Sequence, residues 1–198
     1  MASLFDTEII LQTKDVLVRP IIYNDISGFS EIAFDERIWK FSVNRINSKE
    51  ELENFVQKAL SSRLDRTRYA FTIIDRETGR IAGSTSIGNV SEYDSRAEIG
   101  WTWLGTEFQG KRLNKGTKYL LLNYLFSVLN YKRVEFKTDA LNLQSNRALQ
   151  RIGALEEGVL RSHTLMHDGR RRDTVYYGIL DSEWDEIKRK IFSGYQKE

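Results

Sequence analysis

Apolar residues in the first third of the chain recur with the spacing of one strand and two helices. The segment 16–21 is rich in aliphatic residues, and the only proline, Pro20, stands near its end. Ser48 and Glu51 form a capping box ahead of apolar residues at helical spacing, which indicates a helix start. The predicted elements are a strand at 16–21, a helix from Asn24 or Asp25 to about Ile38, and a helix from Ser48 to about Leu64. Residues 1–15 are expected to form a tail or an accessory strand.

The rest of the chain alternates between strand-like runs and helical segments. Runs at 69–74, 80–88 and 96–104 predict an antiparallel meander, because a short loop with Gly79 joins the first two. The segment 114–130 is apolar on nearly every face, which predicts a helix buried between the sheet and another element. The remaining predicted elements are a strand at 133–138, a helix at about 143–152 ended by Gly153, a hairpin of 159–166 with 172–180, and a C-terminal helix within 181–198. No break divides the pattern, so residues 1–198 are expected to form a single α/β domain.

Composition narrows the chemistry. The chain has 198 residues, 40% of them hydrophobic, which is typical of a folded protein. Its net charge of +2 gives no overall attraction to nucleic acid or to an anionic membrane. Cysteine is absent and there are two histidines, which argues against disulfides, thiolate nucleophiles and a metal site. There is neither an N-terminal signal pattern nor an apolar run near the roughly 20 residues of a membrane span, so a cytoplasmic protein is the simplest interpretation.

A basic loop precedes the apolar helix. The stretch 107–118 places four cations around a helix start, where the backbone already carries partial positive charge: Lys111, Arg112, Lys115 and Lys118. A glycine-bearing loop that enters a helix points several N–H groups at one spot, which suits a pyrophosphate. The alternative is a solvated basic turn that binds nothing. A Walker-type nucleotide loop is excluded, because Thr117 stands where that motif requires lysine.

A second motif at 139–154 makes the identity of the anion more definite. Together with the loop at 109–114, it resembles the GCN5-related N-acetyltransferases, and more narrowly their RimJ/RimL-like branch, which acetylates ribosomal-protein N-termini. The order of the pieces at 97–101, 158–161 and 168–180 extends the resemblance over most of the chain. The loop departs from the family pattern twice, with Arg112 for a glycine and Asn114 for a glycine or alanine.

The resemblance implies a fold and a co-substrate. The fold is of the α/β (α+β) class, with a mixed, mostly antiparallel, twisted sheet of about seven strands flanked by helices. The co-substrate is acetyl-CoA, without a metal. Backbone groups of the central strand are expected to pair with the pantetheine amides and to polarise the thioester carbonyl. The residues expected to bind the coenzyme are Trp101, Trp103, Leu104, Gln109, Gly110, Lys111, Arg112, Leu113, Asn114, Lys115, Asn142 and Ser145.

The acid that protonates the departing thiolate is expected to be a serine. Many superfamily members use a tyrosine seven residues beyond the turn asparagine, but that position holds Leu149. RimJ/RimL-like members carry a serine three residues after the asparagine, which is Ser145, and its hydroxyl could protonate the thiolate. The alternative is that Ser145 only caps the helix.

The base and the acceptor site are less specific in the sequence. Glu98 on the central strand is the candidate base, acting through water, and its alternative is a buried carboxylate bonded across the sheet. His163 titrates in a useful range, but a lone strand histidine is more often structural. Trp39 and Phe41 could line the acceptor cleft together with His163, although aromatic residues there are also typical of a core.

The leading hypothesis is an N-acetyltransferase that acts on a primary amine by direct attack in a ternary complex. The acceptor is either a protein N-terminus or a small molecule, and the sequence does not choose between them. A non-catalytic acyl-CoA-binding module is the alternative from another class. No nucleic acid or membrane partner is expected, because the basic residues cluster at one loop without an aromatic stacking series. The oligomeric state is expected to be a monomer or a homodimer.

Overall fold

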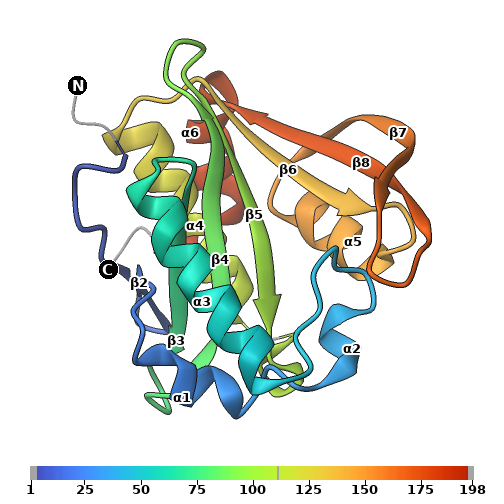
Figure 1. The fold of residues 1–198 in the computed structure, drawn as a ribbon. Helices are drawn as coiled ribbons and strands as arrows, with labels where there is room; N and C mark the ends of the chain where they lie inside the picture. Colours follow the sequence, from blue (N-terminus) through green and yellow to red (C-terminus); the bar gives the residue numbers. More distant parts are fainter. Residues whose placement is uncertain (1–3, 111, 196–198) are drawn as a thin grey trace.

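The computed structural model describes residues 4–110 and 112–195, so Lys111, one of the expected coenzyme ligands, lies outside the described residues. Its centre is an open eight-stranded sheet in the order β1-β2-β3-β4-β5-β6-β8-β7 (Figure 1). The strands are β1 Leu11–Gln12, β2 Val16–Pro20, β3 Arg68–Asp75, β4 Ile81–Ser91, β5 Arg96–Leu104, β6 Arg133–Asp139, β7 Leu155–Leu165 and β8 Arg171–Leu180. Neighbouring strands are antiparallel except β5 and β6, which are parallel. This confirms the expected mixed, mostly antiparallel sheet, with the short β1 as an eighth strand.

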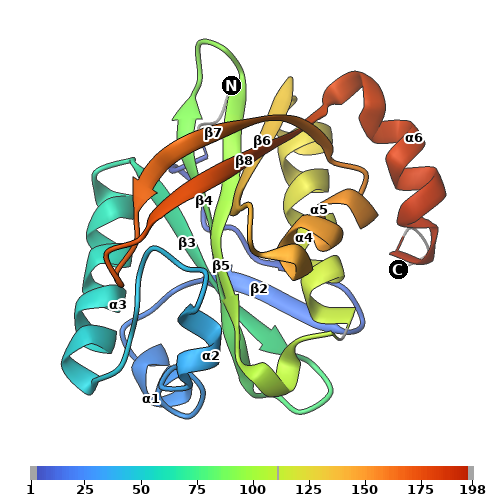
Figure 2. The same cartoon turned by 90° about the vertical axis from the view of Figure 1, so that its right-hand side faces the viewer.

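Helices cover both faces of the sheet (Figure 2). One face carries α1 Asp25–Ser30, α2 Glu36–Trp39 and α3 Lys49–Leu64, and the other carries α4 Arg112–Asn123, α5 Leu143–Arg151 and α6 Asp181–Ile191. A π-helical turn, Tyr124–Val128, continues α4. The long helices bury the apolar positions that the pattern predicted, such as Leu52 and Val56 of α3 and Leu121 of α4. The Ser48 side chain accepts the Glu51 N–H at the start of α3, which confirms the predicted cap.

The helix predicted from residue 24 to 38 is wrong as a continuous element. It is interrupted between Ser30 and Glu36, and two short helices, α1 and α2, take its place. Gly28 inside the first segment weakens helix propagation. The Asp35 side chain then accepts the Arg37 N–H and starts α2. Local capping therefore overrides the helical pattern in this segment.

The two central parallel strands separate soon after they pair. Their pairing covers Arg96↔Arg133, Ala97↔Val134 and Glu98↔Glu135. Beyond Glu98, β5 continues to Leu104 and stays paired with β4, whereas β6 pairs with β8 to its end. In the described part of the chain no strand pairs with the β6-facing edge of β5 from Ile99 onward. A row of backbone groups therefore faces a gap inside the sheet.

A bulge in β5 lies in this open half. Ser86 pairs with Gly100 and Ser84 with Trp103, so β5 contains one more residue than β4 there. Trp101 takes up the extra length with a φ of 51°. Its indole lies over Gly88, where an added Cβ would come within 2.8 Å of the ring. The bulge thus changes the direction of the backbone between Gly100 and Trp103, next to the gap.

Candidate active site

The basic loop is tied to the end of the open strand. Gln109 Nε2 donates a hydrogen bond to the Leu104 carbonyl at 3.1 Å. Gly110 has a φ of 72°, a conformation that strains any residue with a Cβ, and it turns the chain into α4. Arg112, which stands for a family glycine, is the first residue of α4 and is exposed. The N–H groups at this helix start can therefore receive an anion beside the open edge of β5.

Polar atoms in the first turns of α4 lack partners. Asn114 Oδ1 and Thr117 Oγ1 are buried, and neither forms a hydrogen bond with any described residue. Buried polar groups are normally hydrogen-bonded, so two buried oxygens without partners beside a helix start indicate that a polar ligand binds there. Leu113 packs into the core. Lys115 is turned toward the other side of the helix, where its ammonium lies 5.5 Å from the centre of the Phe192 ring.

Lys118 lies in the gap between β5 and β6. The sequence did not predict this position, because Lys118 was interpreted as one of the four cations of the basic loop. Its side chain is buried, and its Nζ donates a hydrogen bond to Thr102 Oγ1 on β5 at 3.0 Å. The same nitrogen is 5.4 Å from the centre of the Phe136 ring on β6. Burial lowers the pKa of Lys118 to about 7, against the opposing charge of Glu98. Its spacing from Leu121 and Leu122, three and four residues later, was the available signal of burial.

Glu98, the candidate base, is 6% exposed and stands at the last β5–β6 pair. Its Oε2 accepts from Asn89 Nδ2 at 2.7 Å and forms an ion pair with Lys137 Nζ at 2.7 Å. A Cβ at Gly100 would lie 2.9 Å from Oε1, so the second oxygen reaches over Gly100 along the open half of β5. One carboxylate oxygen of Glu98 is therefore bonded to residues of the neighbouring strands β4 and β6, and the other lies over Gly100.

His163 lies further across the sheet. Lys137 Nζ is 5.0 Å from the centre of the Tyr176 ring, and the His163 ring meets Tyr176 edge-on at 5.9 Å. Burial alone would lower the pKa of Lys137, but the hydrogen bond and charge of Glu98 raise it above its ordinary value. Two side chains therefore stand between Glu98 and His163. His163 Nδ1 is within 3.1 Å of the Thr174 hydroxyl, a contact typical of a structural histidine.

The turn before α5 places Ser145 and Asn142 together. Asn142 Oδ1 accepts the Ser145 N–H at 3.0 Å, so Asn142 is the N-cap. Ser145 is half-buried in the first turn of α5, and capping, the alternative role considered for it, belongs to Asn142. Leu149, at the family's tyrosine position, is buried in the core.

The aromatic residues proposed for the acceptor are mostly core. Trp39 is 2% exposed, and its ring lies 5.2 Å from that of Trp103. Trp103 also packs against Phe29 at 5.3 Å, and its Nε1 has no partner among the described residues. Phe41 is half-buried. His167 Nε2 donates to the Trp39 carbonyl at 3.2 Å and links the β7–β8 turn to α2.

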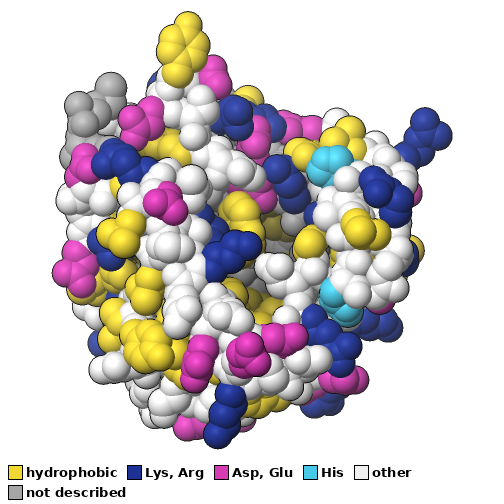
Figure 3. Space-filling model, in the orientation of Figure 1, with side chains coloured by type: hydrophobic (Ala, Val, Ile, Leu, Met, Phe, Trp, Pro, Cys, Tyr) yellow, Lys and Arg dark blue, Asp and Glu magenta, His cyan; other side chains and the backbone are white. Residues whose placement is uncertain are grey.

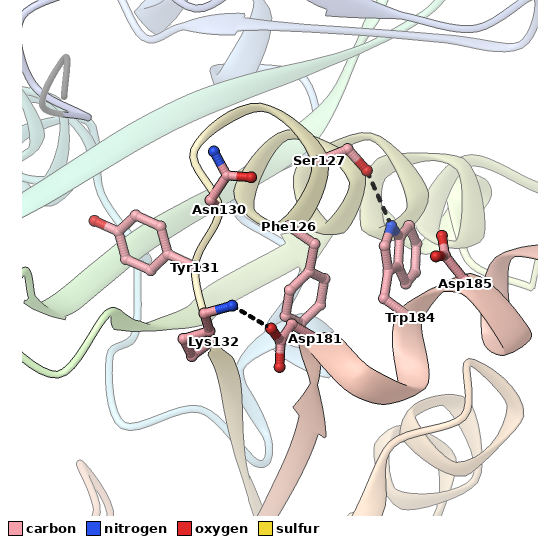
Figure 4. Close-up of a pocket in the computed structure, with 8 residues that line it drawn as sticks. All are labelled: Phe126, Ser127, Asn130, Tyr131, Lys132, Asp181, Trp184 and Asp185. Atoms are coloured by element: carbon pink, nitrogen blue, oxygen red, sulfur yellow. Dashed lines mark hydrogen bonds and ion pairs between the residues drawn. The ribbon is translucent and has the colours of Figure 1, made fainter.

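The molecular surface is hollowed at more than one place. The face in Figure 3 is hollowed between the part that carries α3 and β4 and the part that carries β7 and β8. A separate pocket of about 250 Å³ lies between α6 and the end of the α4 segment (Figure 4). There Lys132 pairs with Asp181 at 2.6 Å, and the Trp184 indole donates to Ser127. It contains none of the predicted site residues.

Residues 4–110 and 112–195 contain neither a metal-binding cluster nor a membrane-spanning helix. No cluster of three histidine, cysteine or carboxylate side chains there could hold a metal ion. No helix in the same ranges has the length and apolarity needed to cross a membrane.

Comparison with known proteins places these features in a family. A family model described as an acetyltransferase (GNAT) domain matches residues 15–155. YdaF of Bacillus subtilis (strain 168), a protein named as a ribosomal N-acetyltransferase, is 36% identical over 110 residues, which are 56% of this chain and 59% of YdaF. A GCN5-related N-acetyltransferase from Brucella melitensis has a TM-score of 0.86 at 25% identity, covering 94% of this chain and 85% of that one. Mycobacterium smegmatis RimJ, solved with CoA-disulfide, has the same fold, with a TM-score of 0.79 at 21% identity over 97% of this chain and 96% of that one.

Proposed function

The chain belongs to the GNAT family of acetyltransferases, and from that premise we propose that this N-acetyltransferase moves the acetyl group of acetyl-CoA to a protein N-terminal amine. The observation that carries the proposal is the unpaired edge of β5 beyond Glu98, which runs toward a helix N-terminus that can hold an anion. A small-molecule amine is the alternative acceptor.

The residues present fit the coenzyme. The buried, unpaired Asn114 Oδ1 and Thr117 Oγ1 mark a polar site at the start of α4, where Gly110 and Arg112 would hold the pyrophosphate. Trp101 and Trp103 would contribute backbone groups at the β5 bulge, since the Trp103 ring is committed to the core. At the far side of the gap, Asn142 at the N-cap of α5 and Ser145 in its first turn would also contact the coenzyme. Leu104 would contribute its backbone N–H, because its carbonyl already accepts a hydrogen bond from Gln109.

The chain's own groups then divide the proton transfers. When bound, acetyl-CoA supplies an activated acyl group as a thioester. Glu98 Oε1, which reaches over Gly100, would accept the proton of the acceptor amine through water. Ser145 would donate a hydrogen bond to the departing sulfur from the first turn of α5. The β5 backbone at the bulge would stabilise the charge that develops on the carbonyl oxygen.

Three observations support a protein acceptor. YdaF is named as a ribosomal N-acetyltransferase, and the match covers 59% of its length. Structural neighbours with the same fold include a ribosomal-protein-S5-alanine acetyltransferase from Vibrio fischeri, with a TM-score of 0.74 at 17% identity. The hollowed face between α3 and the β7–β8 hairpin is open to solvent, which suits the end of a polypeptide (Figure 3).

Thiol release with acetyl-CoA and a panel of amines tests the proposal. The panel pairs peptides with free N-termini against the same peptides with blocked N-termini and an internal lysine, together with amino acids, polyamines and aminoglycosides. We expect release with the free N-termini only. Turnover restricted to small amines would establish the alternative acceptor. Binding of acetyl-CoA without turnover of any amine would establish a non-catalytic module.

A further inference from the structure

Lys118 occupies an unusual position for a lysine. Its amino group reaches from α4 to Thr102 on β5 and to the Phe136 ring on β6, so it spans the two strands where they separate. Burial of an amine in a protein interior costs free energy unless a partner compensates for it. The charged group whose field acts on it, Glu98, is already paired with Lys137. The neutral hydroxyl of Thr102 is therefore its hydrogen-bond acceptor.

The position of this nitrogen determines what it can contact. Thr102 belongs to the open half of β5, four residues beyond the last pair with β6. Any extended group that enters the gap and hydrogen-bonds to the β5 edge comes next to the Lys118 amino group. In the proposed function that group is the pantetheine arm with its thioester. The atom that gains negative charge in the reaction is the sulfur, and an ammonium is a suitable donor to it.

We propose that Lys118 is a further catalytic residue of this acetyltransferase, which faces the thioester sulfur from the α4 side of the gap and protonates the departing thiolate. This inference rests on the proposed function. The acceptor nitrogen forms a bond to the acetyl carbon, and the carbon–sulfur bond breaks with its electron pair on sulfur. A proton moves from Lys118 Nζ to that sulfur, and the acceptor nitrogen loses one toward Glu98. Solvent returns a proton to Lys118 after the products leave.

A role for Lys118 as the base is less consistent with the geometry. Its side chain comes from α4, whereas the acceptor is proposed to enter on the hollowed face beside α3. Glu98 Oε1 already reaches over Gly100 in the open half of β5. The Lys118 amine instead donates to the Thr102 hydroxyl at 3.0 Å, and that hydroxyl also contacts the Thr85 hydroxyl on β4 at 2.7 Å. The two groups therefore divide the proton transfers rather than compete for one.

The ionisation of Lys118 suits proton transfer near neutral pH. Its pKa of about 7 means that protonated and neutral forms are both populated there. The ionisable groups around it are Glu98 on β5 and, beyond Glu98, Lys137 on β6. Lys115, on its own helix, is turned toward Phe192. Lys118 would thus take the acid role that the family resemblance assigns to Ser145, and Ser145 would orient the sulfur by a hydrogen bond.

Lys118→Met tests the assignment with two independent measurements. The first compares the calorimetric affinities of CoA and of desulfo-CoA, which lacks the sulfur. Wild type should bind CoA about tenfold more tightly, as expected for a hydrogen bond to a charged group, and the variant should bind both within twofold. The second is turnover, where we expect kcat to fall about 10²-fold or more while KM changes little. Lys190→Met, an exposed α6 substitution, is the matched control and should change neither.

The outcomes separate this inference from the proposed function. A kcat within threefold of wild type, or an unchanged ratio of CoA to desulfo-CoA affinity, would overturn the role of Lys118. If no amine is turned over by wild type, the proposed function fails, whereas the affinity ratio still tests the contact with sulfur. Lys118→Gln keeps a polar group near Thr102 without a titratable proton, and it replaces the methionine variant if that chain does not fold.

Discussion

A buried amine and a buried carboxylate stand near the point where β5 and β6 separate. Glu98 is the last paired residue of β5, and Lys118 contacts Thr102 further along the same strand. Glu98 is compensated by Lys137 and Asn89, whereas Lys118 has a neutral hydroxyl as its acceptor. Burying two ionisable side chains lowers the stability of the fold, so their presence beside an open strand edge indicates that they serve the function of the site.

The first prediction concerns the free energy of unfolding, which the burial of Lys118 lowers. Its pKa is about 7 in the folded chain against an ordinary 10.5, so between these values the unfolded chain binds more protons and stability rises with pH. From pH 7 to pH 10 this amounts to on the order of 3 kcal/mol. Lys118→Met lacks the titration and should exceed wild type in Tm by more at pH 7 than at pH 10. A calorimetric Tm difference between Lys118→Met and wild type that is the same at pH 7 and at pH 10 would contradict this prediction.

The second prediction concerns the base. Glu98→Gln keeps the shape of the side chain but cannot accept a proton, so kcat should fall about 10²-fold or more at pH 7. The loss should shrink as pH rises toward the pKa of the acceptor amine, because the amine then enters neutral. Full turnover in Glu98→Gln, with His163→Ala inactive and its CoA affinity intact, would assign the base to His163. Thermal melting must accompany the test, since the variant leaves Lys137 without its carboxylate.

At the scale of elements, the sequence pattern predicted most of the sheet and the long helices. The periodicity of α3 and of the β3–β5 meander reflects burial against one core. The spacing of apolar residues within each segment is enough to show which face is buried. The break between α1 and α2 was missed, because it depends on the Asp35 cap outweighing a continuous helical pattern. The burial of Lys118 was missed for a different reason: it depends on where β5 and β6 part, and this is set by pairing between distant segments.

The third prediction concerns the start of α4. Arg112 is exposed at the first turn, so its attraction to a pyrophosphate is worth about 1 kcal/mol and is screened by salt. Arg112→Ala should weaken acetyl-CoA binding about fivefold at low ionic strength and by less in 0.5 M salt. Lys115→Ala should weaken it less, because that ammonium is directed to Phe192. If both substitutions weaken binding equally in calorimetry, the expectation that Arg112 contributes more than Lys115 to coenzyme binding would be wrong.

At the scale of the whole molecule, the sheet consists of two parts joined by one short parallel pairing. Strands β1–β5 form one part and β6–β8 the other, and the parallel pairing between them covers three residue pairs at one end (Figure 1). At the other end His167 donates to the Trp39 carbonyl and links the β7–β8 turn to α2. A ligand inserted between the parts would add hydrogen bonds at the open edge and connect them.

The last prediction follows from this division. Amides of β5 from Ile99 to Leu104 that face the gap should exchange with solvent in the free protein and become protected when CoA binds, because they would then donate to the pantetheine carbonyls. Amides of β3, which lies between β2 and β4, should exchange alike in both states and provide the internal control. The midpoint of thermal unfolding should rise with CoA concentration, as mass action requires of a ligand that binds only the folded chain. Hydrogen exchange that slows only around Gly110 and the start of α4, with β5 unchanged, would mean that the phosphates bind while the gap stays empty, and the proposed path of the coenzyme arm would be wrong.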